Sequence, residues 1–445
     1  MISMNLHQAA AMIGGTLIGK PAQFRGISTD SRQNCSGKLF VALVGENFNG
    51  EEYCQAAINN GAIAVLVTSA QDVSTPQLIC ENSLIALSVL AKNWAKQCQS
   101  KIIAITGSNG KTTVKNMIQS ILSVSHQSIA TQGNLNNEIG VPLTLCNIKA
   151  SDEYAVIEMG AAKLGDISWL SSLVNIHSAV ITNVSTAHIG RFGSFDNIVE
   201  EKGKIVSNLN DKSFAILPIE DSNFDLWKSN TKAEIISFGT SDNADINIQT
   251  NDGLTLVIAN KNITDIKLPV AGFHNQINAG CATAVAESLG INHVDIKIGL
   301  ENFTAASGRL ENLGEIDGNI IINDSYNANP MSVKAAIDVL SQYNGPTTLV
   351  FGDMAELGSD SNVLHQQVGE YAKQQNITHL LTIGKDSKRA GIAFSESIQH
   401  FNSIDTLKTN MLKNWHQLGT ILVKGSRSMH LEDLIEGLRE TEKVA

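Results

Sequence analysis

Short runs of apolar residues alternate along much of the chain with stretches in which apolar side chains recur every three or four positions. In the middle of the chain, the runs Lys101–Thr106, Tyr154–Met159 and Ser178–Val184 are apolar on both faces. The stretches between them have the periodicity of amphipathic helices. Strands that are apolar on both faces and alternate with helices are typical of a parallel sheet covered on both sides. The pattern therefore predicts an α/β fold.

Changes in this pattern divide the chain into three α/β domains. Residues 1–81 predict a small N-terminal α/β domain with short strands and one helix, at Glu51–Gly61. Residues 82–309 predict a central parallel-sheet domain that becomes antiparallel near Ala233–Pro269. Residues 310–445 predict a C-terminal Rossmann-like α/β domain. The expected strands of the two outer domains are Leu39–Leu43, Ala62–Thr68, Asn319–Asn323, Thr347–Gly352, His379–Gly384 and Thr420–Gly425.

Composition and charge narrow the class of protein. The 445 residues are 43% hydrophobic and 17% charged, which supplies several cores and excludes a disordered, highly charged chain. A net charge of −11 disfavours nucleic acid or an anionic membrane as a partner. There is no apolar run of about 18 residues and no signal-like N-terminus, and the six cysteines are scattered without paired spacing. We therefore expect a cytoplasmic protein with reduced thiols.

A glycine-rich turn follows the first of the central strands and precedes a helix. Backbone N–H groups in such a turn can surround a phosphate, and the helix N-terminus adds a positive dipole end. The usual first glycine of a P-loop is Ile105 here, so this is a shortened form. The alternative is a plain turn with a surface lysine, but the strand before and the helix after favour an ATP-binding P-loop. Its residues are Gly107, Ser108, Asn109, Gly110, Lys111, Thr112 and Thr113.

Two ionisable residues stand at the ends of other central strands. Glu158 ends the second apolar run, and His188 follows the third. The carboxyl ends of parallel strands meet at one edge of the sheet, where ligands bind. A carboxylate and an imidazole there can hold divalent ions beside the phosphates. Either residue alone is more often an ordinary hydrogen-bonded strand-end residue, and the P-loop on the same sheet favours the metal-binding alternative.

A lysine lies in the middle of an apolar helical face. In Phe195–Leu209 the apolar side chains define one face, Lys202 sits on that face, and Glu200, Glu201 and Lys204 fall off it. A lysine in this position commonly lays its stem over apolar surface and keeps its amine in water. The functional alternative is a desolvated amine near the active site with a lowered pKa.

Several strings in the chain resemble one family. TGSNGKTT, IEMG, TNVSTAH and GFHNQINAGCATAVA (Gly272–Ala286) are similar to the Mur ligases, ATP-dependent amide-bond synthetases of peptidoglycan assembly. The resemblance spans nearly the whole chain. In the last third, DSYNANP (Asp324–Pro330), FGDMAELG (Phe351–Gly358) with His365 downstream, and VKGSRS (Val423–Ser428) resemble the member that adds D-alanyl-D-alanine.

The resemblance implies a role for individual residues. Lys111 matches the P-loop lysine, and Lys202 matches the lysine that is carbamylated in these enzymes, so Lys111, Lys202 and His188 are the expected catalytic residues. The implied Mg²⁺ ligands are Thr112, Glu158, His188 and Lys202. The implied nucleotide contacts beyond the P-loop are His274, Asn275, Asn278, Arg309 and Asp324. The implied substrate contacts are Ser31 and Arg32 for uridine diphosphate, and Asn134, Asn137, Tyr326 and Asn327.

The resemblance also implies a reaction. We expect a monomeric ligase that uses ATP and Mg²⁺ to join UDP-N-acetylmuramoyl-tripeptide to D-alanyl-D-alanine through an acyl phosphate. The alternatives are another Mur ligase, an enzyme like folylpolyglutamate synthase, or a P-loop nucleotide-binding regulator without synthetase activity. Three positions depart from the family pattern. Asn323 stands where the family often has an aspartate, and Lys204 stands where it usually has a glutamate. Glu200 stands at a position that is often basic or small.

Overall fold

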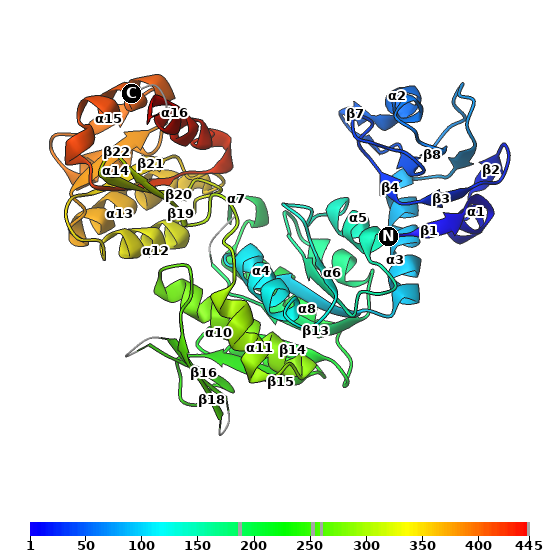
Figure 1. Cartoon of the computed structure of the whole chain (residues 1–445), viewed down its shortest axis with the longest axis horizontal. Coiled ribbons are helices and arrows are strands. Elements are labelled where there is room, and N and C mark those ends of the chain that lie inside the picture. Colours follow the sequence, from blue (N-terminus) through cyan, green and yellow to red (C-terminus); the bar gives the residue numbers. More distant parts are fainter. Residues whose placement is uncertain (186–188, 251–253, 259–260, 443–445) are drawn as a thin grey trace.

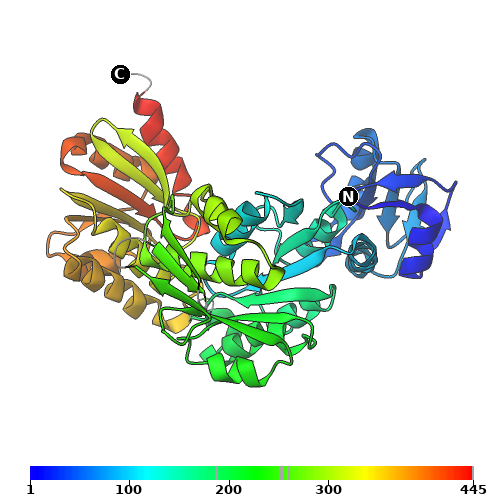
Figure 2. The same cartoon turned by 60° about the horizontal axis from the view of Figure 1, so that its bottom comes forward.

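Three α/β bodies follow one another along the molecule. The computed structural model describes residues 1–185, 189–250, 254–258 and 261–442. The N-terminal and C-terminal bodies lie at opposite ends of the central one (Figure 1), and the order is the same after a turn of 60° (Figure 2). The predicted fold class is confirmed, while the predicted domain limits stay a prediction.

The N-terminal body is built on a small sheet. In the described residues its strand order is β2-β9-β8-β5-β4, with β2 antiparallel to β9 and the other pairs parallel. These strands are β2 (Thr16–Ile18), β4 (Ile27–Ser28), β5 (Leu39–Val41), β8 (Ala64–Val67) and β9 (Gln77–Ile79). Two short pairs accompany them: β1 (Ser3–Asn5) with β3 (Gln23–Arg25), and β6 (Val44–Gly45) with β7 (Phe48–Asn49). The helices are α1 (Leu6–Ile13), which the sequence analysis missed, α2 (Cys54–Asn59) and the 3₁₀ turn η1 (Gly50–Tyr53).

A long helix joins this body to the next one. Helix α3 (Ser83–Cys98) begins at Asn82, whose side chain accepts hydrogen bonds from two backbone N–H groups of the first turn. The helix contacts both α1 of the N-terminal body and α5 (Gly140–Asn147) of the central body. The Ile2 N–H also donates to the Cys146 carbonyl at 2.6 Å. The two bodies therefore share one continuous apolar core.

The central body is a nine-stranded sheet within the described ranges, in the order β11-β12-β10-β13-β14-β15-β16-β17-β18. All pairs up to β16 are parallel, and the last two are antiparallel. The strands are β10 (Lys101–Thr106), β11 (Ser128–Ala130), β12 (Tyr154–Glu158), β13 (Ile176–Ile181), β14 (Phe214–Pro218), β15 (Glu234–Gly239), β16 (Ile246–Gln249), β17 (Leu254–Ile258) and β18 (Lys261–Ile266).

Helices cover both faces of this sheet. Alternate residues of β10 enter two different cores: Ile103 packs beneath α4, α10 and α11, whereas Ala104 joins the core on the side of α5, α6 and α8. The remaining helix bounds are α4 (Lys111–Leu122), α6 (Asp166–Ser171), α7 (Ile189–Phe192), α8 (Phe195–Ser207), α9 (Phe224–Ser229), α10 (Phe273–Leu289) and α11 (His293–Glu301). Because β10 lies between β12 and β13, the carboxyl ends of these three strands meet at one edge.

The C-terminal body holds a second open sheet, six-stranded in the residues described, in the order β19-β20-β24-β21-β22-β23. The last strand in sequence, β24, lies in the middle, parallel to β20 and β21. The strands are β19 (Glu311–Ile316), β20 (Asn319–Asp324), β21 (Thr347–Gly352), β22 (His379–Ile383), β23 (Gln399–Phe401) and β24 (Thr420–Lys424). The helices are α12 (Pro330–Leu340), α13 (Ser361–Gln374), α14 (Lys388–Phe394), α15 (Ile404–Lys413) and α16 (Glu432–Glu442), with 3₁₀ turns η2 (Gly358–Asp360), η3 (Trp415–Gln417) and η4 (Arg427–Met429).

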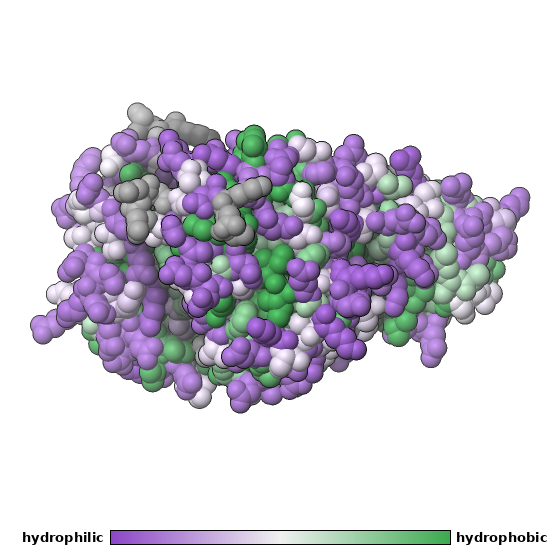
Figure 3. Space-filling view, turned by 90° about the horizontal axis from the view of Figure 1, so that it is seen from below, coloured by the Kyte–Doolittle hydropathy of each residue, from purple (hydrophilic) through white to green (hydrophobic). Residues whose placement is uncertain are grey.

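The surface carries mostly polar side chains. Seen from below, hydrophilic residues cover most of the molecule and apolar residues emerge in separate groups (Figure 3). No helix in the described part of the chain is long and apolar enough to cross a membrane.

Candidate active site

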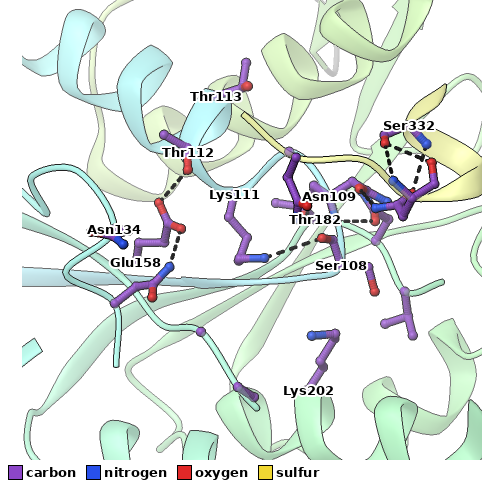
Figure 4. Close-up of a pocket in the computed structure, with 18 of the residues that line it drawn as sticks. Ser108, Asn109, Lys111, Thr112, Thr113, Asn134, Glu158, Thr182, Lys202 and Ser332 are labelled. Atoms are coloured by element: carbon purple, nitrogen blue, oxygen red, sulfur yellow. Dashed lines mark hydrogen bonds between the residues drawn. The ribbon is translucent and has the colours of Figure 1, made fainter. Parts of the chain in front are cut away.

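A cavity of about 1410 Å³ opens where the carboxyl ends of the central strands face the C-terminal body. Ser108 through Thr113 line it, as do residues at the ends of β12 and β13, from α8 and α10, and from the start of the C-terminal sheet. Figure 4 shows the loop after β10 in the middle of this cavity, with Glu158 on one side and Lys202 across from it. Most of the predicted site residues therefore meet in one place.

Two glycines give the phosphate loop its shape. Gly107 has φ of 152° and Gly110 has φ of 79°, values that side chains disfavour. A Cβ at Gly107 would lie 1.9 Å from Thr182 Oγ1, and one at Gly110 would lie 2.6 Å from Asn278 Oδ1. A side chain at either position would strain the backbone and crowd a neighbouring side chain.

The loop backbone is held by the end of β13. Asn183 accepts a hydrogen bond from the Asn109 N–H at 3.0 Å and donates one to the Asn109 carbonyl at 3.1 Å. Thr182 Oγ1 donates to the same carbonyl at 2.6 Å. Sequence analysis did not assign a role to Asn183, although it lies within the string TNVSTAH.

The P-loop lysine is folded back onto its own loop. Lys111 Nζ donates to the Gly107 carbonyl at 2.7 Å, with the Ser108 carbonyl at 3.5 Å. Burial lowers the pKa of this amine and the charge of Arg309 adds to the effect, whereas the carboxylate of Glu158 opposes it. A phosphate arriving here would give the buried ammonium group a compensating charge.

Glu158 is almost completely buried at the carboxyl end of β12, with 2% exposure. Thr112 Oγ1 donates to Glu158 Oε2 at 2.9 Å, and Asn136 Nδ2 donates to Oε1 at 2.8 Å. A hydroxyl and a carboxylate side by side suit a hard cation that also takes phosphate oxygens and water. Among the residues that the structure describes, no cluster of three or more His, Cys, Asp and Glu could hold a metal alone. His188, the other predicted ligand, lies outside the described residues.

Lys202 is buried in α8, with 3% of its surface exposed. Burial lowers the pKa of its amine to about 7, and the nearby Lys111 charge acts in the same direction, while Glu201 opposes the shift. The structure thus places a buried amine with a lowered pKa at the cavity.

The prediction that Glu201 lies off the buried face was wrong. Glu201 is 1% exposed. Its Oε1 accepts from the Ile167 N–H at 2.6 Å and its Oε2 accepts from the Gly165 N–H at 2.7 Å. These backbone donors at the start of α6 compensate for burying the carboxylate, which a helical periodicity argument alone could not anticipate.

The C-terminal body contributes an ion pair, and its Tyr326 ring stacks with an arginine at the junction with the central body. Asp324 Oδ2 lies 2.6 Å from Lys424 Nζ, and its Oδ1 accepts from the Leu310 N–H at 3.1 Å. Burial raises the pKa of Asp324, and the Lys424 ammonium opposes that shift. Arg309 stacks over the Tyr326 ring, 4.2 Å from its centre. Lys424 was missed as a site residue because its partner lies a hundred positions away.

The first turn of α10 faces the P-loop. Asn275 Nδ2 donates to the Ala271 carbonyl at 2.7 Å, and Asn278 Nδ2 donates to Asn275 Oδ1 at 3.2 Å. Burial lowers the pKa of His274 to about 4, helped by the Lys424 charge and opposed by Asp338. His274 is therefore a neutral ring that borders the cavity.

The predicted substrate contacts separate into two groups. Asn134, Asn137, Tyr326 and Asn327 line the cavity. Ser31 and Arg32 lie in the N-terminal body, outside the residues that line the cavity. There Arg32 pairs with Asp30 at 2.9 Å, and that guanidinium lowers the pKa of Asp30 to about 2.

Three segments of the chain match domains of one family. Residues 23–105 match the Mur ligase family, catalytic domain, residues 105–286 the Mur ligase middle domain, and residues 308–427 the Mur ligase, glutamate ligase domain. The UDP-N-acetylmuramoyl-tripeptide–D-alanyl-D-alanine ligase of Escherichia coli (strain K12) is 37% identical over 449 residues, which cover 99% of each chain.

Solved structures agree with this match. The crystal structure of MurF from Acinetobacter baumannii is 33% identical, covers 98% of both chains and has a TM-score of 0.90. MurF ligase from Thermotoga maritima, solved in complex with ADP, is 25% identical, covers 95% of this chain and 99% of its own, and has a TM-score of 0.83. This chain belongs to the Mur ligase family.

Proposed function

We propose that the chain is an ATP-dependent ligase that joins D-alanyl-D-alanine to UDP-N-acetylmuramoyl-tripeptide, giving the pentapeptide precursor, ADP and phosphate. The observation that carries the proposal is one cavity in which the loop Ser108–Thr113 faces Arg309, at the junction of the central and C-terminal bodies, and Lys424 of the C-terminal body. Similarity over the full length to relatives that bear the name of this ligase supports the choice of substrates.

ATP binds with its phosphates against Ser108–Thr113, where Lys111 and Arg309 supply positive charge. His274, Asn275 and Asn278 border the adenine side, and Asp324 faces the ribose. Thr112 and Glu158, with His188 and a modified Lys202, are the residues that would hold Mg²⁺. When bound, this ion neutralises phosphate charge and positions the phosphate oxygens.

The chemistry has two steps. The terminal carboxylate of the tripeptide attacks the γ-phosphorus, the bond to the β-phosphate oxygen breaks, and ADP leaves an acyl phosphate behind. The free amine of D-alanyl-D-alanine then attacks the acyl carbon, phosphate departs and the amine loses a proton. Lys111 and Arg309 stabilise the charge that moves during the first step. The C-terminal body lines one side of the cavity, and its closure over the phosphates would exclude water, which would otherwise hydrolyse the acyl phosphate.

Lys202 carries a further part of the proposal. Carbon dioxide adds to a neutral amine, and with a pKa of about 7 this amine is substantially neutral near pH 7. The resulting carbamate has two oxygens suited to a hard cation. Lys202→Ala should lose most activity, and short-chain carboxylic acids should partly restore it. Full activity of Lys202→Arg would contradict the carbamate, because guanidinium keeps its charge.

On the substrate side, Ser31 and Arg32 contact the uridine diphosphate, while Asn134, Asn137, Tyr326 and Asn327 contact the peptide part and the incoming dipeptide. We place the reaction in the cytoplasm, in agreement with six free, buried cysteines. We also propose that the enzyme acts as a monomer.

Release of ADP, measured in a coupled assay, tests the function. The proposal expects turnover only when ATP, UDP-N-acetylmuramoyl-tripeptide and D-alanyl-D-alanine are all present. Turnover with a folate and glutamate, or with an earlier muramoyl precursor and a single amino acid, would instead identify one of the sibling ligases. ATP binding without turnover on any of these mixtures would identify a nucleotide-binding regulator.

A further inference from the structure

The C-terminal body reaches the phosphate loop through one side-chain amide. Asn329 Nδ2 donates to Asn109 Oδ1 at 2.6 Å, joining residues 220 positions apart in the chain. Asn109 is the loop residue whose backbone N–H and carbonyl are already held by Asn183. The backbone of Asn109 is therefore held by the central body. Its side chain contacts both bodies, because Nδ2 donates to Ser185 Oγ of the central body at 3.4 Å, while Oδ1 accepts the shorter bond from Asn329.

Asn329 has a second, local role that leaves its amide nitrogen available. It is the N-cap of α12: its Oδ1 accepts from the Ser332 N–H at 3.0 Å, and its own N–H donates to Ser332 Oγ at 3.0 Å. The cap uses the side-chain oxygen alone. Because this cap fixes the side chain at the start of α12, the direction of the amide nitrogen follows the position of the whole C-terminal body.

We propose that Asn329 is a positioning residue that couples placement of the C-terminal body to the shape of the phosphate loop. The hydrogen bond to Asn109 forms only when α12 lies over the loop. A loop shaped by nucleotide therefore favours this position of α12, and by linkage this position favours nucleotide binding. The inference rests on the proposed function only in taking the nucleotide to be ATP.

A second contact between the same bodies does not involve the loop. Arg191 of α7 pairs with Glu356, and the Gly190 N–H donates to the Glu356 carbonyl at 3.4 Å. This contact holds the bodies together at the surface, since the Arg191 side chain is 53% exposed. Of the two contacts, only the Asn329–Asn109 hydrogen bond touches the phosphate loop.

The test compares Asn329→Ser, Asn109→Ala and the double variant in the full chain. Serine is an equally good N-cap but is too short to reach Asn109, so α12 should keep its stability. Asn292→Ser is the matched control, because Asn292 caps α11 through the Asp295 N–H and lies outside the cavity lining. The probe is a non-hydrolysable ATP analogue, with its dissociation constant measured by calorimetry.

We expect Asn329→Ser to weaken binding of the analogue about threefold to tenfold, the range that one net hydrogen bond supplies. In the Asn109→Ala background the same substitution should have no further effect, and Asn292→Ser should bind as the wild type does. Additive losses would show that Asn329 touches the nucleotide directly and would overturn the proposal. Unchanged binding by Asn329→Ser would also overturn it.

A measurement without nucleotide separates this inference from the proposed function. Fluorescence energy transfer between dyes on the central and C-terminal bodies reports their separation. Asn329→Ser should increase the separated population relative to the wild type and to Asn292→Ser, even if the wild type binds no ATP analogue. An identical distance distribution in all three proteins would overturn the coupling, whatever the enzyme assay gives.

Discussion

Lys111 occupies the centre of the phosphate loop with its amine bonded to the loop's own carbonyls. Replacing it with alanine removes the cation without touching the helix, because alanine is the best helix former. We expect Lys111→Ala to lower the rate of ligation on the order of 10²-fold or more, since it removes one positioned charge at the reacting phosphate. Steady-state ADP release measures the loss, and thermal unfolding checks the fold. Activity within a few-fold of the wild type would contradict the loop assignment.

His274 gives the stability of the protein a specific pH dependence. Its pKa is lowered to about 4 in the folded protein, against 6.5 for an ordinary histidine. Above pH 6.5 the ring is neutral in both states, so its full contribution is present there. As the pH falls from 6.5 toward 4, the unfolded chain binds a proton that the folded chain refuses, and stability is lost.

Substitution isolates this contribution. We expect the wild type to lose on the order of 2 kcal/mol more unfolding free energy between pH 6.5 and 4 than His274→Gln does. Urea unfolding at a series of pH values measures the difference. His416→Gln, at an exposed position, is the matched control and should follow the wild type. Parallel curves for the wild type and His274→Gln would contradict the shifted pKa.

Residues with a local signature could be predicted, and residues with distant partners could not. Lys111 and Thr112 follow from one short string, and Glu158 follows from its place at a strand end. Asn183 and Lys424 lie in strings that resemble the family, but their roles, like that of Asn136, come from partners on other elements. The side chain of Asn136, for example, meets Glu158 only after β12 has entered the sheet.

At the scale of elements, the pairing of α6 with α8 depends on Glu201. Its two carboxylate oxygens satisfy backbone N–H groups of Gly165 and Ile167. We expect Glu201→Ala to destabilise the protein by roughly 2–4 kcal/mol, because a charge-assisted pair of bonds is lost and a buried donor is left unpaired. Chemical unfolding measures the difference in unfolding free energy between this variant and the wild type.

The adjacent residue provides the comparison. Glu200 is on the same helix, but its side chain is 64% exposed and pairs with Lys204 at 2.9 Å. Glu200→Ala should therefore change the unfolding free energy by less than about 1 kcal/mol. Equal effects of the two substitutions would mean that the buried hydrogen bonds of Glu201 contribute little.

Periodicity predicted the buried parallel strands well because those strands are apolar on both faces. Periodicity failed where a charged side chain is buried, as at Glu201. It also missed α1, whose run LHQAAAMI is too short for helical periodicity to separate it from the neighbouring strands. The structure shows what defines this helix: Asn5 and Gln8 form a capping box, and Gly14 ends it.

At the scale of the whole molecule, all six cysteines are buried and free. Burial raises the pKa of Cys54 and of Cys80 to about 11, so neither is a thiolate near neutral pH. We expect the native protein to show no fast reaction with a thiol reagent such as DTNB at pH 8. The unfolded protein should react at all six cysteines and release six equivalents of thionitrobenzoate per chain. A fast native phase would indicate that one of these sites opens readily.

The position of β24 has a consequence for how the protein is made. This strand is the last of its sheet to be synthesised, yet it lies between β20 and β21 and carries Lys424 at its end. A nascent chain that stops before β24 can complete its N-terminal and central bodies, but its C-terminal sheet stays split, with two unpaired strand edges open to aggregation. Premature termination near the end of translation therefore yields a chain with a finished phosphate loop and no Lys424 to pair with Asp324. Such a chain cannot ligate, and its open strand edges make it a substrate for chaperones and proteases.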